Sequence, residues 1–332
     1  MIVLPATVVD RLYPPSAALA GVREAVLAHR SGRDTTPPRT ALGAHEVGGE
    51  MLVMPAVLAQ EAFAVKVWHR FEGRDGAPAS SSASVLLVDP ELGQEVLMDG
   101  ACITDRRTAA MTALVALSHA PAHARVLCVI GAGVQARATV EALLHALPGL
   151  SEVRIVARRE DRARALVAEC AAWAVPATAD ADERTWRALT DVGAGVRGAD
   201  VVVAATTSAL PVVPDEALAP EVLVCGVGSH DPASAEIEPA TVVRAGVRIV
   251  DTFAGGLDGA GDLAAPLASG AIARADVVEL SAVADGSAPA RVPGRVSVFK
   301  SVGFAGLDAV AARTVARAAL AQGAGVVVDL HG

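Results

Sequence analysis

A glycine-rich turn joins an apolar run to a helical pattern in VLCVIGAGVQARATVEAL (126–143). The five residues before GAGVQA are typical of a buried strand, and apolar residues at helical spacing follow it. A G-x-G-x-x-A turn in this setting connects the first strand and helix of a βαβ unit and binds a dinucleotide. The stretch therefore predicts a nucleotide site near the middle of the chain.

The small residues of this turn have separate tasks. Gly131 permits the tight turn, Gly133 lets the backbone approach a pyrophosphate, and Ala136 allows the helix to pack close to the sheet. Val134 and Gln135 lie between them, at the helix N-terminus, where unpaired N–H groups attract phosphate. We expect all five residues to contribute to cofactor binding.

Further apolar runs alternate with helical or polar stretches beyond this turn. They lie at 153–157, 199–208, 221–229 and 247–251, and a helical pattern covers 159–174. Continuous apolar strands that alternate with helices are typical of a parallel sheet covered on both faces. The sequence thus predicts a Rossmann dinucleotide-binding domain, which we place at 116–306.

The two ends of the chain have a different pattern. Short alternating runs bounded by Pro and Gly predict a mostly antiparallel or mixed sheet, and a helix and a strand return at the end of the chain. The expected strands are 52–56, 63–68, 84–89, 95–99 and 324–330, and the expected helices are 16–32, 104–120 with Thr104 as N-cap, and 306–323. We therefore predict an α/β fold in which the Rossmann domain is inserted into a mixed α/β domain built from 1–115 and 307–332.

The end of the second Rossmann strand bears on the choice of cofactor. An NAD site usually has an acidic residue there, about 20 residues after the glycines, that binds the ribose 2′-hydroxyl. This chain has Ala157, followed by Arg158 and Arg159. Guanidinium groups suit a 2′-phosphate, although Glu160 and Asp161 would weaken their field. NADP(H) is favoured over NAD(H).

Composition excludes several other classes of protein. Charged residues sum to 28 − 37 = −9 and aromatic residues make up 3%, which disfavours a nucleic-acid binder. No apolar run reaches the roughly 18 to 20 residues that span a bilayer, and the first residues do not resemble a signal peptide. Four isolated cysteines indicate neither a metal site nor disulfides, so we expect a cytoplasmic protein that binds no metal, nucleic acid or membrane.

Several motifs in order resemble the ornithine cyclodeaminase/mu-crystallin family. They are MPA (54–56), FAVKVW (63–68), ITDRRTAA (103–110), GAGVQA with its unusual Gln135, and FKSVGFAGLDAVAA (299–312). The resemblance runs from about residue 39 to near the end of the sequence. It implies the two-domain architecture above, with substrate residues and a homodimer interface in the second domain. It also implies hydride exchange between a nicotinamide and the α-carbon of an amino or imino acid.

The resemblance further implies which residues hold the substrate carboxylate. Arg39, Lys66 and Arg107 match the family's substrate-binding Arg, Lys and Arg. An arginine can bind a carboxylate in bidentate fashion. Lys66 lies in an apolar strand, where burial would lower its pKa and help it to donate a proton. Arg106 is assigned to the helix surface.

One stretch separates the activities found within the family. In CGVGSHDPASAEIEP (225–239), His230 stands where the cyclodeaminases have a catalytic Asp in a stretch resembling GGD-x-PGKTE, and Asp231 follows it. Cyclisation needs a base that also attracts the second, cationic amine of the substrate, and histidine supplies no negative charge. We assign catalytic roles to Lys66, His230 and Asp231, although Asp before Pro is also a frequent turn former.

These residues favour reduction of a C=N bond by NAD(P)H, giving a proline- or pipecolate-type product. By resemblance, Thr206 and Ser208 contact the cofactor and Val227 lines the nicotinamide pocket. Three alternatives stay open. They are an ornithine or lysine cyclodeaminase that recycles bound NAD⁺, an alanine-type dehydrogenase, and an NADP-dependent ligand-binding protein with little turnover.

Overall fold

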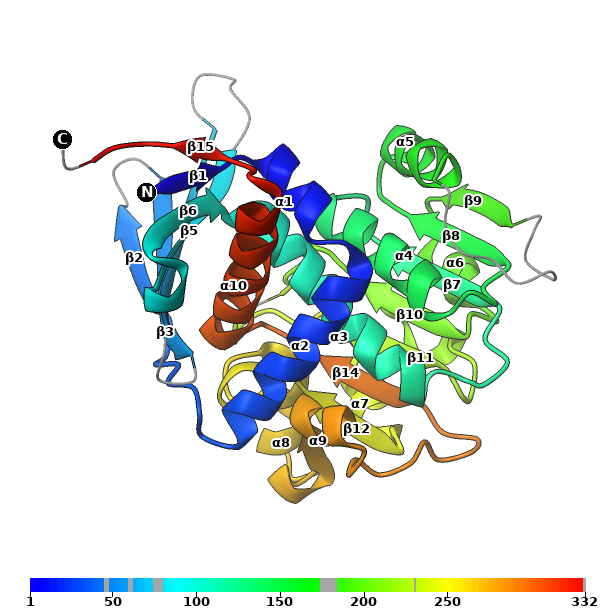
Figure 1. Ribbon diagram of the computed structural model, residues 1–332. Helices are drawn as coiled ribbons and strands as arrows, with labels where there is room; N and C mark the ends of the chain where they lie inside the picture. Colours follow the sequence, from blue (N-terminus) through cyan, green and yellow to red (C-terminus); the bar gives the residue numbers. More distant parts are fainter. Residues whose placement is uncertain (45–47, 59–61, 74–79, 174–183, 230, 331–332) are drawn as a thin grey trace. The chain divides into compact units, whose positions relative to one another are not determined.

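The computed structural model describes residues 1–44, 48–58, 62–73, 80–173, 184–229 and 231–330. The chain folds as two compact units. Unit 1 comprises Met1–Arg107 and Phe304–Gly332, and unit 2 comprises Thr108–Gly303. Figure 1 shows the elements of each unit. The boundary at 107/108 falls inside helix α3 (Gly100–His119).

Unit 1 contains a seven-stranded mixed sheet in the order β15-β1-β6-β5-β4-β3-β2. Strand β1 pairs with β6 in parallel, and all the other pairs are antiparallel. The strands are β1 (Ile2–Leu4), β2 (Thr40–Ala44), β3 (Gly49–Leu58), β4 (Ala62–Phe71), β5 (Ser80–Asp89), β6 (Gln94–Asp99) and β15 (Val326–Val327). This arrangement confirms the predicted mixed sheet.

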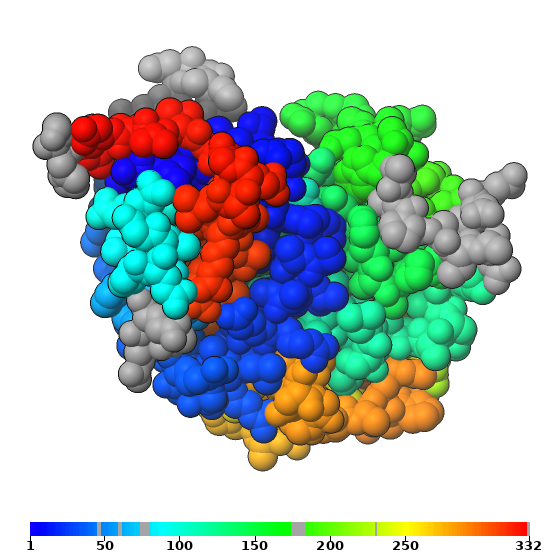
Figure 2. Space-filling model, viewed as in Figure 1, coloured from blue at the N-terminus to red at the C-terminus, as the bar shows by residue number. Residues whose placement is uncertain are grey.

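Residues of these strands alternate between a covered and an open face of the sheet. Met54, Lys66 and Val85 lie opposite one another on neighbouring strands, and all three are buried. The long helix α10 (Ala305–Gln322) contacts β3, β4 and β5, and packs against α2 (Pro15–Arg30). Figure 2 shows the red atoms of the C-terminal segment beside the blue atoms of the N-terminal one. Both ends of the chain therefore build the same core.

Helix α3 begins earlier than the sequence indicates. Asp99, the last residue of β6, accepts a hydrogen bond from the backbone N–H of Cys102 at 2.7 Å and so caps the first turn. The expectation that Thr104 is the N-cap is wrong. Thr104 lies in the second turn, where its hydroxyl donates to the carbonyl of Gly100 at 2.7 Å.

Unit 2 is built on an eight-stranded, all-parallel sheet in the order β13-β12-β14-β11-β10-β7-β8-β9. The strands are β7 (Val126–Ile130), β8 (Glu152–Val156), β9 (Thr185–Leu189), β10 (Val201–Ala204), β11 (Leu223–Gly226), β12 (Val247–Val250), β13 (Val277–Glu279) and β14 (Ser297–Lys300). The helices that connect them include α4 (Val134–Ala146), α5 (Glu160–Ala171), α6 (Val192–Val196), α7 (Pro239–Arg244), α8 (Gly261–Ala268) and α9 (Leu280–Asp285). The predicted Rossmann-type sheet is confirmed.

The chain order reverses between β7 and β10. Strands β8 and β9 lie on one side of β7, whereas β10 and β11 lie on the other. Ligands of open parallel sheets bind at the carboxyl ends of the strands, at such a reversal. Strand β14 was not expected from the sequence, and it runs between β11 and β12.

None of the helices in the described ranges combines the length and the apolar character that a membrane crossing requires. The four cysteines are free, and Cys128, Cys170 and Cys225 are buried.

Candidate functional site

Unit 1 brings Lys66, Arg107 and Asp308 together in its interior. Lys66 is in the middle of β4, Arg107 is in α3, and Asp308 is in the first turn of α10. Their exposed fractions are 3%, 4% and 1%. The Nζ of Lys66 lies 2.7 Å from Oδ2 of Asp308, and the Nε of Arg107 donates to Oδ1 at 3.2 Å. One carboxylate thus faces two buried cations.

Arg107 is the residue of this cluster that can still donate hydrogen bonds to a ligand. Within the described part of the chain, the hydrogen bonds of Arg107 are confined to its Nε atom. Its two terminal nitrogens keep the fork that binds a carboxylate in bidentate fashion. Lys66 also donates to the hydroxyl of Thr104 at 3.3 Å, which holds the ammonium between strand and helix.

Arg39 supplies a third positive charge close to Lys66. Thr40, the first residue of β2, pairs with Val53 in β3, so the same register brings the preceding Arg39 next to Met54. Met54 in turn pairs with Lys66 in β4. The charge of Arg39 contributes to the lowered pKa of Lys66. All three residues that the resemblance assigns to the substrate carboxylate therefore lie in one region of unit 1.

The electrostatics of this cluster follow from burial and charge. Burial lowers the pKa of Lys66 from 10.5 to about 8; Arg107 and Arg39 lower it too, against the opposing charge of Asp308. Burial alone would raise the pKa of Asp308, but the charges and hydrogen bonds of Lys66 and Arg107 hold it below its usual value. Burial, followed by the charge of Asp308, raises the pKa of the nearby Tyr13, which therefore stays a neutral phenol.

Sequence reasoning missed Asp308. The residue lies in FAGLDAVAA (304–312), a segment whose resemblance to the family is noted above, without a role for its acid. The available signal was the single charge among apolar neighbours on a helix whose first turns are wholly buried.

Unit 2 places the glycine turn at the carboxyl end of β7. Gly131 has φ +124, and a Cβ there would lie 2.3 Å from the carbonyl oxygen of Ala205. Gly133 is the N-cap of α4 and has no side-chain cap, and a Cβ there would meet no atom within 4 Å. Packing therefore requires glycine at 131, whereas glycine at 133 leaves open space in front of the helix N-terminus. Ala136 is buried against the sheet.

We expect Gly131→Ala to weaken both the fold and nucleotide binding. The added methyl group collides with the backbone of Ala205, and φ +124 is unfavourable for an L residue, which together should cost about 1–3 kcal/mol. Urea denaturation would measure the loss of stability, and titration with ADP would measure binding. Gly133→Ala is the matched control for stability, because it meets no protein atom, yet it should also weaken ADP binding. Equal stability of the two variants would contradict this interpretation of the turn.

The other predicted cofactor residues lie at the same edge of the sheet. Thr206 and Ser208 follow β10, and the hydroxyl of Thr206 accepts from the backbone N–H of Ser208 at 3.2 Å. Val227 follows β11 and is 8% exposed. Val134 is 64% exposed in the first turn of α4, next to the half-buried Gln135.

The arginines after β8 are at the surface. Arg159 is the N-cap residue of α5 and forms an ion pair with Asp161 at 2.5 Å, as the adjacent acids suggested. Glu160 pairs with Arg164 instead, at 2.6 Å. Arg158 is exposed.

Of the two loop residues that were assigned catalytic roles, the structure describes one. His230 lies outside the described residues. Asp231 is exposed, and its side chain accepts from the backbone N–H of Ala233 at 2.9 Å, which is the geometry of an Asx turn.

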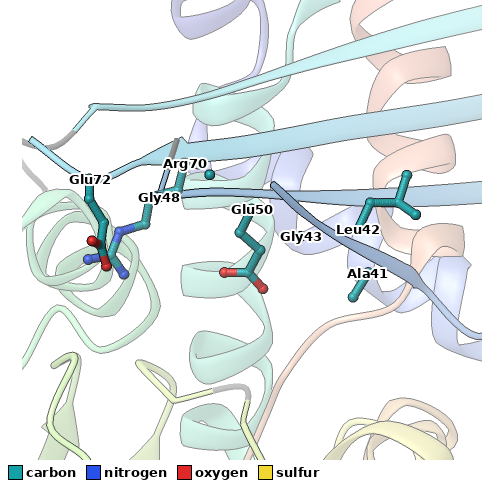
Figure 3. A pocket seen from close by; sticks show the side chains of 8 residues that line it. Ala41, Leu42, Gly43, Gly48, Glu50, Arg70 and Glu72 are labelled. Carbon is teal, nitrogen blue, oxygen red and sulfur yellow. The ribbon is translucent and has the colours of Figure 1, made fainter. Parts of the chain in front are cut away.

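A surface pocket of about 480 Å³ also lies in unit 1, at the far end of β3 and β4 (Figure 3). It is lined by Ala41, Leu42, Gly43, Gly48, Gly49, Glu50, Arg70 and Glu72. Arg70 is opposite Glu50 in the sheet and four residues beyond Lys66. Two carboxylates against one guanidinium do not suit an anionic substrate, and Lys66, Arg107 and Asp308 are not among the lining residues.

Comparison with known proteins gives the wider context. Residues 2–323 match the model of the ornithine cyclodeaminase/mu-crystallin family. The chain is 34% identical over 308 residues to ketimine reductase mu-crystallin of Mus musculus, covering 90% of this chain and 91% of that protein.

Two solved structures are similar over nearly the whole chain. Delta(1)-pyrroline-2-carboxylate reductase of Thermococcus litoralis, in complex with NADH and L-proline, has a TM-score of 0.88 and 27% identity, covering 99% of this chain and 100% of that one. An archaeal alanine dehydrogenase dimer with bound NAD has a TM-score of 0.85 and 25% identity, covering 99% of each chain.

Proposed function

Because the chain belongs to the ornithine cyclodeaminase/mu-crystallin family, we propose that it is an NAD(P)H-dependent oxidoreductase that reduces the C=N bond of an α-imino acid. The product is a proline- or pipecolate-type cyclic amino acid. A ketimine reductase and a pyrroline-2-carboxylate reductase among the similar proteins support this reaction class.

The observation that carries the proposal is the charge of the buried cluster in unit 1. Lys66 and Arg107 share the single carboxylate of Asp308, and Arg39 adds a further positive charge nearby. Buried cations are costly unless they are paired. A substrate carboxylate that binds the terminal nitrogens of Arg107 supplies the missing anion, and it fixes the orientation of the α-carbon next to it.

Lys66 suits the proton transfer that accompanies reduction. A bound reduced nicotinamide supplies the hydride to the α-carbon of the C=N bond. The electron pair of that bond then remains on the nitrogen, which takes up a proton. With a pKa of about 8, Lys66 is protonated at neutral pH. This pKa is also close enough to neutral pH for Lys66 to give up its proton.

In unit 2, we assign cofactor binding to the carboxyl edge of the parallel sheet. Gly131, Gly133, Val134, Gln135 and Ala136 form the turn that receives the pyrophosphate. Thr206, Ser208 and Val227 lie after β10 and β11, where the nicotinamide half binds.

His230 and Asp231 complete the proposed set of residues. A histidine in the place of the cyclodeaminase carboxylate favours simple reduction, in which His230 polarises the substrate. The Asx turn of Asp231 supports a role in shaping this loop.

We assign a preference for NADP(H), based on Ala157 and the exposed Arg158. Because Arg159 is paired with Asp161, Arg158 is the better candidate for the 2′-phosphate. Arg158→Asp should therefore shift the ratio of kcat/KM for NADPH over that for NADH at least tenfold towards NADH. Arg164→Asp, in the second turn of α5, is the control and should leave the ratio unchanged. An unchanged ratio in both variants would show that the 2′-phosphate is not bound there.

We also assign a homodimer formed through the open face of the unit 1 sheet. Leu42, Met51, Phe63 and Phe71 lie on this face, with exposed fractions of 53%, 38%, 59% and 42%. An apolar face of this kind is typical of a subunit interface. Phe63→Glu should convert a dimer to a monomer in light scattering after size-exclusion chromatography. A monomeric wild-type protein would contradict the assignment.

A substrate panel tests the proposed reaction. The protein is incubated with NADPH or NADH and with cyclic imino acids, or with 2-keto acids plus or minus amines, and the loss of absorbance is followed. Ornithine and lysine are tested with NAD⁺ in parallel. Oxidation of NAD(P)H by cyclic imines is the expected result. No oxidation with any imine, together with proline or pipecolate formed from the diamines, would overturn the proposal in favour of a cyclodeaminase.

A further inference from the structure

A group of three buried charged side chains in unit 2 takes no part in the proposed chemistry. Glu236 and Lys300 are 0% exposed, and Asp262 is 1% exposed. The Nζ of Lys300, at the end of β14, lies 2.9 Å from Oδ2 of Asp262 and 3.7 Å from Oε2 of Glu236, and it donates to the carbonyl of Ser229 at 2.8 Å. Buried ion pairs seldom add net stability, so such a group calls for a different explanation.

The carboxylate of Glu236 joins the segments that follow two different strands. Its Oε1 accepts from the backbone N–H and the hydroxyl of Thr206, after β10, at 2.8 and 2.9 Å. Its Oε2 accepts from the backbone N–H groups of Gly228 and Ser229, after β11, at 2.7 and 3.0 Å. One side chain therefore ties together both loops at this edge of the sheet.

Asp262 holds Glu236 in turn. Its Oδ1 accepts from the backbone N–H groups of Glu236 and Ile237 at 2.8 and 3.0 Å. The loops also approach one another closely, because a Cβ on Gly228 would lie 2.0 Å from the carbonyl oxygen of Thr206. The arrangement has little tolerance for a shift of either loop.

The hydrogen bonds require Glu236 to be an anion. The pKa of Glu236 is raised, because the effect of burial outweighs the lowering by Lys300 and by the donors from Thr206 and Ser229. The geometry nevertheless favours the anion: both oxygens face donors, so a protonated carboxyl group would leave one donor opposite its own O–H. Lys300, which also pairs with Asp262, contributes a positive charge to the group.

The position of this network in the sheet indicates its purpose. The glycine turn follows β7, and the position next to the ribose follows β8. A dinucleotide bound across the reversal of strand order extends from there towards β10 and β11. We propose that Glu236, held by Lys300 and Asp262, is a positioning residue that sets the two loops for the nicotinamide half of the cofactor. This inference rests on the proposed cofactor site.

Glu236→Gln in the full-length protein tests the proposal. Glutamine keeps the size of the side chain but directs an NH₂ group at donors. The Kd for NADPH should rise at least tenfold, whereas the Kd for ADP, which uses only the β7 and β8 side, should change less than twofold. In the protein without nucleotide, hydrogen exchange in peptides that contain Thr206 or Gly228 and Ser229 should accelerate at least tenfold.

Leu150→Ala is the matched control for lost stability. Leu150 is fully buried just before β8, at the opposite edge of the sheet. It should lower the melting temperature while leaving the ratio of the two Kd values unchanged. If Glu236→Gln does not fold, Asp262→Asn provides a milder test of the same ratio, with an expected change of at least threefold.

The outcomes separate the two proposals. An equal loss of ADP and NADPH binding, or no loss of either, would overturn the positioning role. A wild-type protein that binds neither nucleotide would overturn the proposed function. The exchange measurement would still show whether Glu236 fixes the loops.

Discussion

Arg107→Met should lower kcat/KM for the imino acid by about a thousandfold. The terminal nitrogens of Arg107 form no hydrogen bond within the described part of the chain, so the proposed substrate could accept two charged hydrogen bonds from them, each contributing about 1.5–3 kcal/mol. The sum corresponds to a loss of roughly 10²–10⁴-fold. Methionine fills the space of the arginine stem, and Asp308 keeps its ion pair with Lys66, so the fold should survive. Steady-state kinetics with the best imine of the panel would measure the loss.

The neighbouring arginine provides a matched control. Arg106 pairs with the half-exposed Asp10 at 2.6 Å. The side chain of Arg106 is 11% exposed, so its assignment to the helix surface is wrong. Arg106→Met removes the same charge from the same helix but should change kcat/KM less than twofold, because the guanidinium of Arg106 is paired with Asp10 and not with Asp308. Similar losses in the two variants would mean that only the positive field of the helix matters. A loss below fivefold in Arg107→Met would remove Arg107 from the substrate site.

Asp308→Asn should have the largest effect on stability. It leaves Lys66 and Arg107 buried without their carboxylate, which typically costs about 3–5 kcal/mol of the free energy of unfolding. Urea denaturation at pH 7 would measure it. Asp10→Asn is the control and should cost less than about 1 kcal/mol, because the carboxylate that it removes is half-exposed to solvent.

The same variant should change the dependence on pH. In the wild-type protein, kcat/KM for reduction should fall as pH rises through about 8, because Lys66 loses the proton that it is proposed to donate. Asp308 raises the pKa of Lys66, so its loss should move this fall to lower pH. If the pH profile of kcat/KM is the same in Asp308→Asn as in the wild-type protein, another group donates the proton.

The free energy of unfolding should change with pH in the opposite direction to kcat/KM. The pKa of Lys66 is about 8 in the folded protein and 10.5 in the unfolded chain. Between these values the unfolded state binds more protons, so this residue makes stability increase as pH rises from about 8 to about 10.5. In Asp308→Asn the increase should begin at a lower pH.

The sequence was most informative where a local pattern carries the function. The glycine turn, the apolar strand around Lys66 and the helix around Arg107 each have a short-range signature, and the structure has a turn, strand or helix at each of them. The start of α3 was misplaced because Asp and Thr are both frequent N-cap residues, and Asp99, not Thr104, caps the helix.

Groups assembled from distant segments could not be predicted. Lys66, Arg107 and Asp308 meet only because β4, the first part of α3 and α10 belong to one unit, and no spacing in the sequence indicates it. Strand β14 has only four residues, two of which are Ser297 and Lys300, so it lacks a clear strand pattern. Without its place between β11 and β12, the network of Glu236 could not be recognised.

The contribution of α10 to unit 1 has a consequence for biosynthesis. Unit 2 is continuous from Thr108 to Gly303, so every strand of its sheet has been translated before α10 emerges from the ribosome. Unit 1 starts earlier but lacks Asp308 until then, so Lys66 and Arg107 have to wait for the carboxylate that they contact. At a synthesis rate of about 5–20 residues per second, the first unit waits roughly ten seconds or more for its last helix. A released chain that is truncated at residue 303 should therefore hold a protease-resistant second unit and an open first one.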